Sequence, residues 1–432
     1  MNLARLFAVL WRSAVGLLLL GALGLGALVL ADSTRDPDAI AAAVRQAFTE
    51  RRLGDANGFD YANGRELSHF SECIGLSTAI SKDSEPPLWF SLTSPALLWT
   101  APIPMCRTLQ DEVAGTPTSR YYAYSRYWHG YRLLTEPVLS RFSYATLQWL
   151  CAGLLAIATL GFALAAIRGT NSMQPLAAIG AVLLTTETAF LFMTPTHAVS
   201  FSVLLGAAAL VLHLAGDADD RADRLFPPVF LLGAAYNFFD FLYNPDLMMF
   251  LAGWGYLVTR LGREPPATGR ALAQAIALQM ASVAGYVAMW VLKWMLVYAG
   301  GLIYGATPWL PADHVNRWLA GGEHGYLPFA ATLALIRQSI ATPQTALLMG
   351  ASILGYAIAL LLALRQGRAY AVLALGGLWL APLAIVEVKA GHTIMHAPFT
   401  WRLLPWAAAM TAAAALAVLR RAEPIRRPSA AR

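Results

Sequence analysis

The chain has 432 residues, of which 57% are hydrophobic and 13% carry a formal charge. Soluble globular proteins carry roughly 25% charged residues, so this composition excludes a soluble enzyme and a disordered chain. Apolar runs of about twenty residues instead predict a polytopic, all-α membrane protein. The net charge of +6 does not require a nucleic-acid partner, because the basic residues fit a membrane topology.

A helix needs about 20 apolar residues to cross the hydrocarbon core of a bilayer, and about ten segments are predicted to do so. We expect these spans at 7–31, 145–167, 172–194, 198–215, 225–243, 246–260, 271–299, 345–364, 369–387 and 403–419. They divide the chain into an N-terminal transmembrane helix (1–31), a first periplasmic loop (32–143), transmembrane helices 2–7 (144–299), a second long periplasmic segment (300–344), transmembrane helices 8–10 (345–420) and a cytoplasmic tail (421–432).

Arginine sets the expected orientation. With the N-terminus inside, the short outer loops hold almost no basic residue besides Lys389 and Arg402. The inner loops and the tail hold Arg168, Arg221, Arg224, Arg260, Arg263, Arg270, Arg365, Arg368, Arg420, Arg421, Arg426, Arg427 and Arg432. The positive-inside rule therefore predicts a multi-pass protein of the bacterial inner membrane with both termini in the cytoplasm.

Two expectations concern the chain on the outer side of the first span. Val29-Leu30-Ala31 has the small residues of a signal-peptide processing site, so cleavage stays open, although the apolar stretch is longer than a typical signal core. Cys73 and Cys106 both fall in the first outer loop, where thiols oxidise readily, and we expect a disulfide between them. Two free buried thiols are the alternative.

The polar residues gather on the predicted outer face. Glu187, Asp240 and Glu387 each lie toward the outer end of a span, and ionisable residues at membrane depth usually face a cavity or a partner. Seven of the eight histidines map to the same face: His69, His129, His197, His314, His324, His392 and His396. The working surface is therefore expected to be periplasmic.

Acidic residues of the first loop are candidates for a general base. The stretch GFDYANGRELSHFSECIGL contains Asp60, Glu66 and Glu72. Any one of them could instead be an ordinary solvated charge. Glu72 is the strongest candidate, because it stands in an apolar-leaning run beside Cys73, and Asp60 is the second.

The stretch YSRYWHGYRLL places Arg126, His129 and Arg132 just ahead of the second span, where they could bind an anionic group. Tyr127 and Trp128 suit the headgroup zone, and an aromatic belt would explain them without a binding function. That belt does not explain the adjacent arginine and histidine.

The stretch YNFFDFLYNPD contains Asn237, Asp240 and Asn244 at the outer end of the fifth span, which we expect Pro245 to end. The two asparagines are seven residues apart and would share a helical face. Three polar residues on one side predict a lined cavity, whereas a single one could be a structural cap.

A last polar stretch, EVKAGHTIMHAPFTWRLLPW, contains Glu387, Lys389, His392, His396 and Arg402. The spacing of the histidines puts both rings on one helical face, but a zinc site needs three or four ligands, so we expect neither a metal nor a cofactor. Cations beside a bilayer suit a lipid-linked phosphate better. Lys293, in WVLKWML, either joins them or is a snorkelling lysine.

These pieces resemble the integral-membrane glycosyltransferases of the GT-C architecture, and among them the TfpW-like pilin arabinofuranosyltransferase group. The resemblance rests on YSRYWHGY, NFFDF, GYVAMWVLKW and HTIMHAPFTWR, in this order along the chain. Relatives carry an Asn-x-Ser/Thr-Asp-Ala-like stretch where this chain has HFSECIGL, which matches their acidic position to Glu72, with glutamate in place of aspartate.

The resemblance implies a GT-C-like bundle that moves a sugar, arabinofuranose in that group, from a polyprenyl-phosphate donor to a periplasmic protein such as pilin or to a surface glycan. Glu72 or Asp60 would act as the base. The candidates for holding the donor phosphate are Arg126, His129, Lys293, His392, His396 and Arg402, and those for holding the sugar are Asn237, Asp240, Asn244 and Trp128. Three alternatives stay open: a transporter or flippase of a lipid-linked or anionic solute, a polysaccharide ligase or polymerase, and a non-catalytic assembly subunit.

Overall fold

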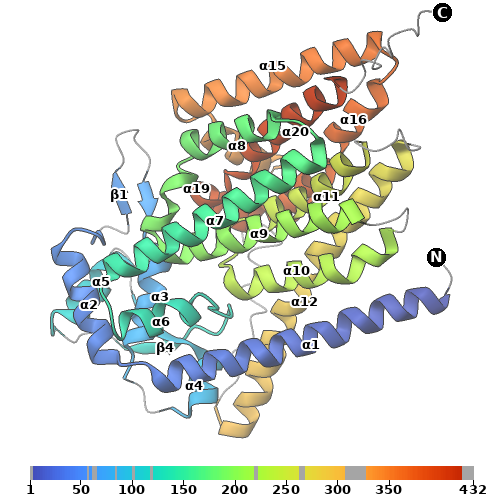
Figure 1. The fold of residues 1–432 in the computed structure, drawn as a ribbon. Coiled ribbons are helices and arrows are strands. Elements are labelled where there is room, and N and C mark those ends of the chain that lie inside the picture. Colours follow the sequence, from blue (N-terminus) through green and yellow to red (C-terminus); the bar gives the residue numbers. More distant parts are fainter. Residues whose placement is uncertain are drawn as a thin grey trace, which may run out of the picture.

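The computed structural model describes residues 3–55, 58–60, 66–82, 85–99, 103–116, 120–217, 222–261, 268–306 and 327–420. In this part of the chain, long helices run side by side, and a smaller polar unit lies at one end of them (Figure 1). We call that end of the bundle the loop end. His314 and His324, and with them residues 307–326 of the second long periplasmic segment, lie outside the described residues.

Seven spans in the described residues are long and apolar enough to cross a membrane. Six are single helices: α1 (Leu3–Thr34), α7 (Tyr144–Thr170), α9 (Pro195–Asp217), α12 (Thr268–Tyr304), α15 (Pro343–Arg365) and α20 (Leu403–Arg420). The seventh joins α16 (Ala369–Gly377) and α17 (Leu380–Val388). The chain is therefore an all-α polytopic membrane protein, as its composition predicts.

Three predicted spans form shorter helices: α8 (Gln174–Thr185), α10 (Phe226–Phe239) and α11 (Pro245–Leu261), with 12, 14 and 17 residues. At 1.5 Å per residue they extend over roughly 18 to 26 Å, less than the hydrocarbon core of about 30 Å. The predicted helix over 172–194 is broken at Glu187, which has a left-handed backbone (φ 58°) and precedes the 3₁₀ helix η1 (Thr188–Met193). The count of ten spans stays a prediction.

The helix predicted over 225–243 ends earlier than expected. α10 stops at Phe239, and Pro245 begins α11 instead of ending α10. Proline suits the first turn of a helix, where its missing N–H has no partner to lose. Residues Asp240–Asn244 form the connection, which we call the 240–244 turn, so Asn237 and Asn244 do not share a helical face.

The described residues between 37 and 139, most of the first loop, fold into a compact unit, which we call the loop unit. Its elements are α2 (Pro37–Thr49), β1 (Gly58–Asp60), β2 (Glu66–Ser68), α3 (Phe70–Ile80), α4 (Pro87–Thr93), β3 (Pro95–Leu97), α5 (Met105–Val113), β4 (Tyr121–Ala123) and α6 (Arg132–Leu139). The strands pair as two short antiparallel ladders, β1 with β2 and β3 with β4. α3 lies at the centre of the unit and is buried from Ser71 to Ile80.

A disulfide joins Cys73 of α3 to Cys106 of α5, as the sequence predicts. Both cysteines are fully buried. The bond closes a loop with a sequence separation of 33, which in a chain-entropy description stabilises the fold by about 3–4 kcal/mol. We expect replacement of both cysteines by serine to lower the midpoint of thermal unfolding. Intact-mass analysis with and without reductant checks the bond, and an unchanged midpoint in the double variant would contradict its role.

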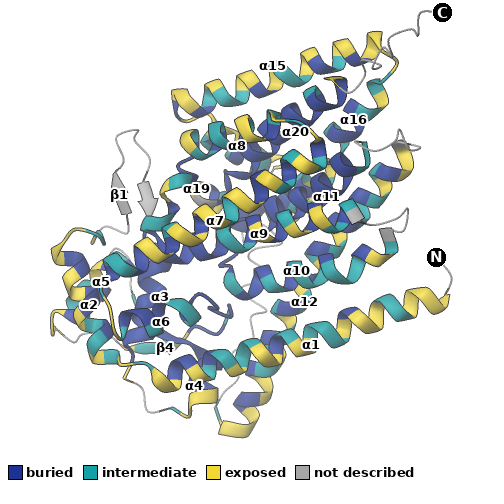
Figure 2. Cartoon of the chain, in the orientation of Figure 1, coloured by how far each residue is buried: buried dark blue, intermediate teal, exposed yellow. Residues whose placement is uncertain are grey.

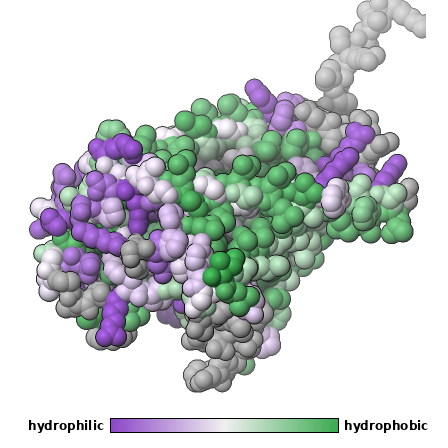
Figure 3. Space-filling view, turned by 90° about the horizontal axis from the view of Figure 1, so that it is seen from below, coloured by the Kyte–Doolittle hydropathy of each residue, from purple (hydrophilic) through white to green (hydrophobic). Residues whose placement is uncertain are grey.

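The burial pattern fits a bundle in lipid. Large apolar side chains of α1, α7 and α15 point outward, among them Leu23, Ile157 and Leu361, whereas α11 and α20 are enclosed (Figure 2). Seen from below, hydrophilic residues cover the loop unit and a broad hydrophobic band covers the spans (Figure 3). Which side of a membrane the loop unit faces stays a prediction.

α10 and α12 cross at very close range. A Cβ on Gly233 would overlap the Ser282 carbonyl, and one on Gly285 would overlap the Phe230 carbonyl. Small residues let the two backbones meet in this way. The crossing brings Tyr286 of α12 to Asp240 at the end of α10. The remaining described elements are η2 (Ala222–Leu225), α14 (Ala330–Ser339), α18 (Ala390–Met395) and α19 (Ala397–Thr400).

Candidate functional site

Glu72 lies in the first turn of α3 and is fully buried. Its Oε2 accepts a hydrogen bond of 2.8 Å from the backbone N–H of Thr196, in the first turn of α9. The start of a helix carries unpaired N–H groups and the positive end of the helix dipole, so it stabilises a nearby carboxylate. α9 thus holds the carboxylate at the junction of the loop unit and the bundle.

Burial raises the pKa of Glu72 from 4.5 to about 7, against the opposing effect of hydrogen bonds from Thr196 and Tyr144. A carboxyl group with a pKa near neutrality can both take up and release a proton at physiological pH. The second predicted base, Asp60, belongs to β1, where its backbone pairs with Glu66. The side chain of Asp60 lies outside the described part of the structure.

The 240–244 turn connects α10 to α11 at the loop end, and hydrogen bonds to Asp240 hold it in place. The Asp240 carboxylate accepts hydrogen bonds from Ser200 Oγ of α9 at 2.8 Å and from Tyr286 Oη of α12 at 2.9 Å. It also accepts from the backbone N–H of Tyr243, at 3.1 Å to Oδ2. Asp240, predicted to hold the sugar, therefore orients the turn between two helices. A contact of its own with a sugar stays a prediction.

Two side-chain oxygens beside this turn have no hydrogen-bond donor among the described residues: Asn237 Oδ1 and Asn244 Oδ1. Both asparagines are buried, with exposed fractions of 2% and 3%. Buried polar groups nearly always have a partner, supplied by the protein, by water or by a ligand. The two predicted sugar-binding amides thus have capacity left for a polar ligand.

The YSRYWHGY stretch packs directly on the turn. The ring of Phe241 lies 4.9 Å from that of His129 and 5.2 Å from those of Tyr127 and Tyr131, measured between centroids. The backbone N–H of Gly130 donates to the Phe238 carbonyl at 2.8 Å. The first loop therefore closes over the end of α10.

His129, predicted to bind phosphate, is buried among aromatic rings. Its Nε2 donates to the Tyr124 carbonyl at 3.2 Å, and because a carbonyl only accepts, Nδ1 is left to accept from the Tyr131 hydroxyl at 3.0 Å. Burial, together with the charge of Lys293, lowers the pKa of His129 to about 3. The structure thus favours a neutral imidazole that positions Tyr131, and a phosphate contact stays a prediction.

His197 lies beside Tyr243 of the turn, and Arg402 lies close to His197. The ring of His197 lies against that of Tyr243, with 4.0 Å between the centroids and an interplanar angle of 33°. Arg402 lies close enough to His197 for its charge to act on the ring, and its Nε donates to the Thr186 carbonyl at 3.1 Å. Arg402 thus lies beside the His197–Tyr243 pair of rings.

A group of basic residues gathers near Leu242 of the turn. His392 Nε2 donates to the Leu242 carbonyl at 3.1 Å, and the rings of His392 and His396 lie 4.5 Å apart, on one face as predicted. Burial, with a smaller effect of the nearby charges of Lys389 and Arg126, lowers the pKa of His396 to about 4. Arg126, His392 and His396 thus come together, with Lys389 as a fourth member.

Lys293 and Trp128 lie apart from these groups. The Lys293 ammonium is fully buried, lies 5.1 Å from the centroid of the Trp128 ring and donates to the Ser91 carbonyl at 3.2 Å. Trp128 Nε1 donates to the Met289 carbonyl at 2.9 Å, and its ring packs on Phe238. Both residues join α12 to the loop unit, and their predicted contacts with the donor stay predictions.

Beside Lys293 lies a buried ion network of Asp32, Arg132 and Glu136. Arg132 forms an ion pair with Asp32 at the end of α1 and a second with Glu136, at 2.8 Å. The Arg132 guanidinium also donates to Ser94 Oγ at 3.0 Å, and Ser91 Oγ donates to Asp32. The network fastens α1 to the loop unit.

Strained backbone marks the loop end. His129, Leu242 and Glu187 have φ angles of 59°, 66° and 58°, in the left-handed region that bulky residues seldom adopt. Such a conformation costs about 1–3 kcal/mol and persists only where the surrounding contacts impose it, most often at functional sites. Two of the three residues belong to the contact between YSRYWHGY and the 240–244 turn.

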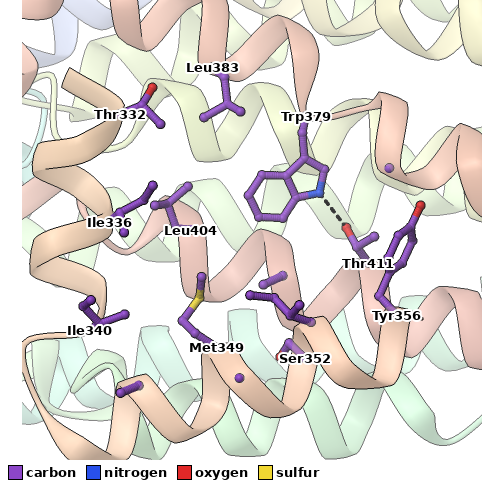
Figure 4. Close-up of a pocket in the computed structure, with 15 residues that line it drawn as sticks. Thr332, Ile336, Ile340, Met349, Ser352, Tyr356, Trp379, Leu383, Leu404 and Thr411 are labelled. Atoms are coloured by element: carbon purple, nitrogen blue, oxygen red, sulfur yellow. Dashed lines mark hydrogen bonds between the residues drawn. The ribbon is translucent and has the colours of Figure 1, made fainter. Parts of the chain in front are cut away.

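An apolar cavity of about 640 Å³ lies between α14, α15, α16, α17 and α20 (Figure 4). Its described wall includes Ile336, Met349, Ile353, Leu383 and Leu404, and on α15 the lining extends from Ala346 to Tyr356, roughly 15 Å along the helix. Two of the lining residues are joined by a side-chain hydrogen bond, which Trp379 Nε1 donates to Thr411 Oγ1 at 3.1 Å. At one end, Thr332 donates to Glu387 through its N–H and its hydroxyl.

Comparison of the chain with protein-family models, with curated proteins and with solved structures found no match.

The structure adds residues that sequence reasoning missed. Tyr286 and Ser200 hold Asp240, and Asp246 forms an ion pair with Lys389 at 2.7 Å. Asp246 carried a signal as a carboxylate at the start of an apolar helix, and Tyr286 stands in the GYVAMWVLKW stretch, whereas Ser200 carried none. Among the described residues, no group of three or more histidine, cysteine, aspartate or glutamate side chains is arranged to hold a metal ion.

Proposed function

We propose that this protein is a membrane glycosyltransferase that moves a sugar from a polyprenyl-phosphate donor to an acceptor hydroxyl. The observation that carries the proposal is the arrangement around the 240–244 turn. Glu72, a buried carboxyl group with a raised pKa, lies near Tyr243 of this turn, and the basic residues Arg126, Lys389, His392 and His396 gather where His392 donates to Leu242, at the loop end of a membrane bundle. The loop unit is then periplasmic, in the inner membrane, with both termini cytoplasmic.

The chemistry follows from these groups. The Glu72 carboxylate takes the proton of the acceptor hydroxyl, whose oxygen attacks the anomeric carbon of the sugar. The bond from that carbon to the phosphate oxygen breaks, and the polyprenyl phosphate leaves with the electron pair. Arg126 and Arg402 supply positive charge where negative charge develops, which is often the largest contribution to catalysis. His396, a neutral imidazole, offers one N–H donor beside Arg126. Asn237 and Asn244 offer their amide oxygens to sugar hydroxyls.

The apolar cavity supports a lipid-linked donor. Its volume lies in the usual range of ligand sites, and its wall is almost wholly apolar. It borders the segment that carries Lys389, because Leu383 and Lys389 are six residues apart, roughly 9 Å along a helix. An isoprenoid chain in the cavity therefore brings its phosphate within reach of the cations. Arabinofuranose is the sugar, and pilin or a surface glycan the acceptor, that the resemblance to the pilin arabinofuranosyltransferases favours.

A transfer assay tests the function directly. The full-length protein in lipid nanodiscs is supplied with polyprenyl-phosphoryl arabinofuranose, labelled in the sugar, and with pilin, a surface glycan or no acceptor. We expect labelled acceptor together with released polyprenyl phosphate, an unchanged rate in EDTA, and no transfer from a nucleotide sugar. Movement of the labelled lipid across the bilayer without transfer to any acceptor would favour a flippase and contradict the proposal.

A further inference from the structure

Lys389 and Asp246 form a buried ion pair between segments far apart in the chain. Lys389 follows α17, and Asp246 lies in the first turn of α11. The ammonium nitrogen is 2.7 Å from Asp246 Oδ2, and the exposed fractions of the two side chains are 10% and 3%. Neither residue belongs to the groups assigned above to the base or to the sugar.

The hydrogen-bonding capacity of this pair is largely unused. An ammonium group has three N–H donors and a carboxylate has lone pairs on both oxygens. Among the described residues, Lys389 Nζ has no hydrogen-bond acceptor in good geometry, and Asp246 Oδ1 has no donor. A buried ion pair offsets its desolvation only when further hydrogen bonds satisfy both partners. This pair is therefore well placed to exchange one partner for a ligand.

The surroundings of Lys389 favour an anion. Its charge acts on both His392 and His396, and that of Arg126 acts on His396. Glu387, the nearest acidic residue in sequence, is directed elsewhere, since its Oε1 accepts from the N–H and the hydroxyl of Thr332 at 2.8 and 2.6 Å. Asp246 thus supplies the negative charge that balances Lys389.

We propose that the Asp246 carboxylate occupies the place of the donor's phosphate, and that Lys389 passes from Asp246 to the phosphate when a prenyl phosphate binds. This inference rests on the proposed function. Breaking the bond to the sugar turns a phosphodiester with one negative charge into a phosphate monoester, which carries up to two. Lys389 therefore binds the leaving group more strongly than the intact donor, which is the differential binding that speeds a reaction.

Binding of farnesyl phosphate to the full-length protein in detergent tests the exchange without sugar or acceptor. We expect Lys389→Gln to weaken binding by about tenfold or more, because a charge-assisted contact is lost. Asp246→Asn is expected to tighten binding several-fold, because the competing carboxylate is removed. The control Glu50→Gln, which removes a partly exposed carboxylate of the loop unit, is expected to leave binding unchanged.

Uncharged and soluble probes separate the possible sources of the anion. Farnesol is expected to bind equally well to the wild type and to Lys389→Gln, because it has no charge. Inorganic phosphate is expected to compete only at much higher concentration, because it lacks the chain. If it binds as tightly as farnesyl phosphate, the site takes a soluble anion and the lipid assignment is wrong.

The exchange is wrong if Asp246→Asn folds but binds farnesyl phosphate as weakly as Lys389→Gln. Asp246 would then only hold Lys389 in position and would not be replaced by the phosphate. If Asp246→Asn does not fold, Asp246→Glu replaces it and must bind like the wild type, because it keeps the competing charge. An exchange confirmed in this binding assay, in a protein that transfers no sugar, would refute the proposed function alone. Normal farnesyl phosphate binding by Lys389→Gln would refute this inference alone.

Discussion

Replacement of Glu72 by glutamine is expected to lower the rate of sugar transfer by about 10²–10⁴-fold, the usual contribution of a positioned general base. Glutamine keeps the size of the side chain and can still accept the hydrogen bond from the N–H of Thr196, so the fold around α3 is retained. What is lost is the group that takes the proton of the acceptor. The measurement is the initial rate of transfer to the acceptor at saturating donor.

The pH profile gives a second test of the same role. Because burial raises the pKa of Glu72 to about 7, the carboxylate form is scarce in mildly acidic solution. We expect kcat/KM of the wild type to rise as the pH increases through about 7 and then to level off. The residual activity of Glu72→Gln should lack this step.

Stability separates a catalytic loss from a folding defect. The folded state favours the protonated form of Glu72, because the pKa of this side chain is 4.5 in the unfolded chain and about 7 in the folded protein. Ionisation of this buried carboxyl group therefore lowers the free energy of unfolding. The loss is absent below pH 4.5, grows as the pH rises, and reaches about 3 kcal/mol once the pH has passed 7. Glu72→Gln should match the wild type in thermal stability at about pH 5 and equal or exceed it at about pH 8.

Glu50, at the end of α2, offers a matched control, since its carboxylate is partly exposed and bound to Arg52 at 2.7 Å. Glu50→Gln is expected to retain full activity. Full activity in Glu72→Gln, with loss in Asp60→Asn, would assign the base to Asp60. Full activity in both variants would contradict a first-loop base altogether.

Hydropathy and residue type were sufficient to predict part of this structure. Apolar runs long enough to cross a bilayer predict the spans because every backbone group in lipid must be bonded within its own helix. The disulfide followed from two cysteines in one polar loop. Short helices escape the same reasoning, and the end of α10 at Phe239 depends on Asp240, whose carboxylate binds Ser200 and Tyr286 from other helices.

The sequence predicts which types of residue gather at the candidate site better than it predicts the contacts that each residue makes there. Glu72, His129, Asp240 and His392 all lie at the loop end and are connected through the contacts of the 240–244 turn. Their chemical states depend on packing that no local pattern encodes. His129 has a strongly lowered pKa because aromatic rings enclose it, although its place beside Arg126 in the sequence predicted a cation.

Lys293 shows the same limit. A lysine in an apolar helix is read from sequence either as a ligand or as a snorkelling side chain. In the structure it lies over Trp128 beside the buried ion network of Asp32, Arg132 and Glu136. Of the members of that network, only the i,i+4 spacing of Arg132 and Glu136 is visible locally. Their pairing with Asp32, a hundred residues earlier in the chain, is a product of the tertiary fold.

Replacement of Arg132 by methionine is expected to destabilise the fold by about 3–5 kcal/mol, because it leaves buried carboxylates without their partner. Arg132 is fully buried. It forms ion pairs with Asp32 of α1 and with Glu136, and it donates a hydrogen bond to Ser94. The double variant Arg132→Met, Glu136→Gln removes the guanidinium together with one of its two carboxylate partners. It leaves Asp32 beside Lys293. We expect it to recover part of the loss.

The measurement is the midpoint of thermal unfolding of the full-length protein in detergent. Arg107→Met is the matched control, because Arg107 forms two ion pairs, with Asp55 and Asp111, but is half exposed, and such pairs contribute about 0–1 kcal/mol. The order of midpoints should be wild type and Arg107→Met highest, the double variant next and Arg132→Met lowest. If the double variant is less stable than Arg132→Met alone, the packing of Glu136 outweighs its charge. The network would then act by filling space instead of by balancing charge between α1 and the loop unit.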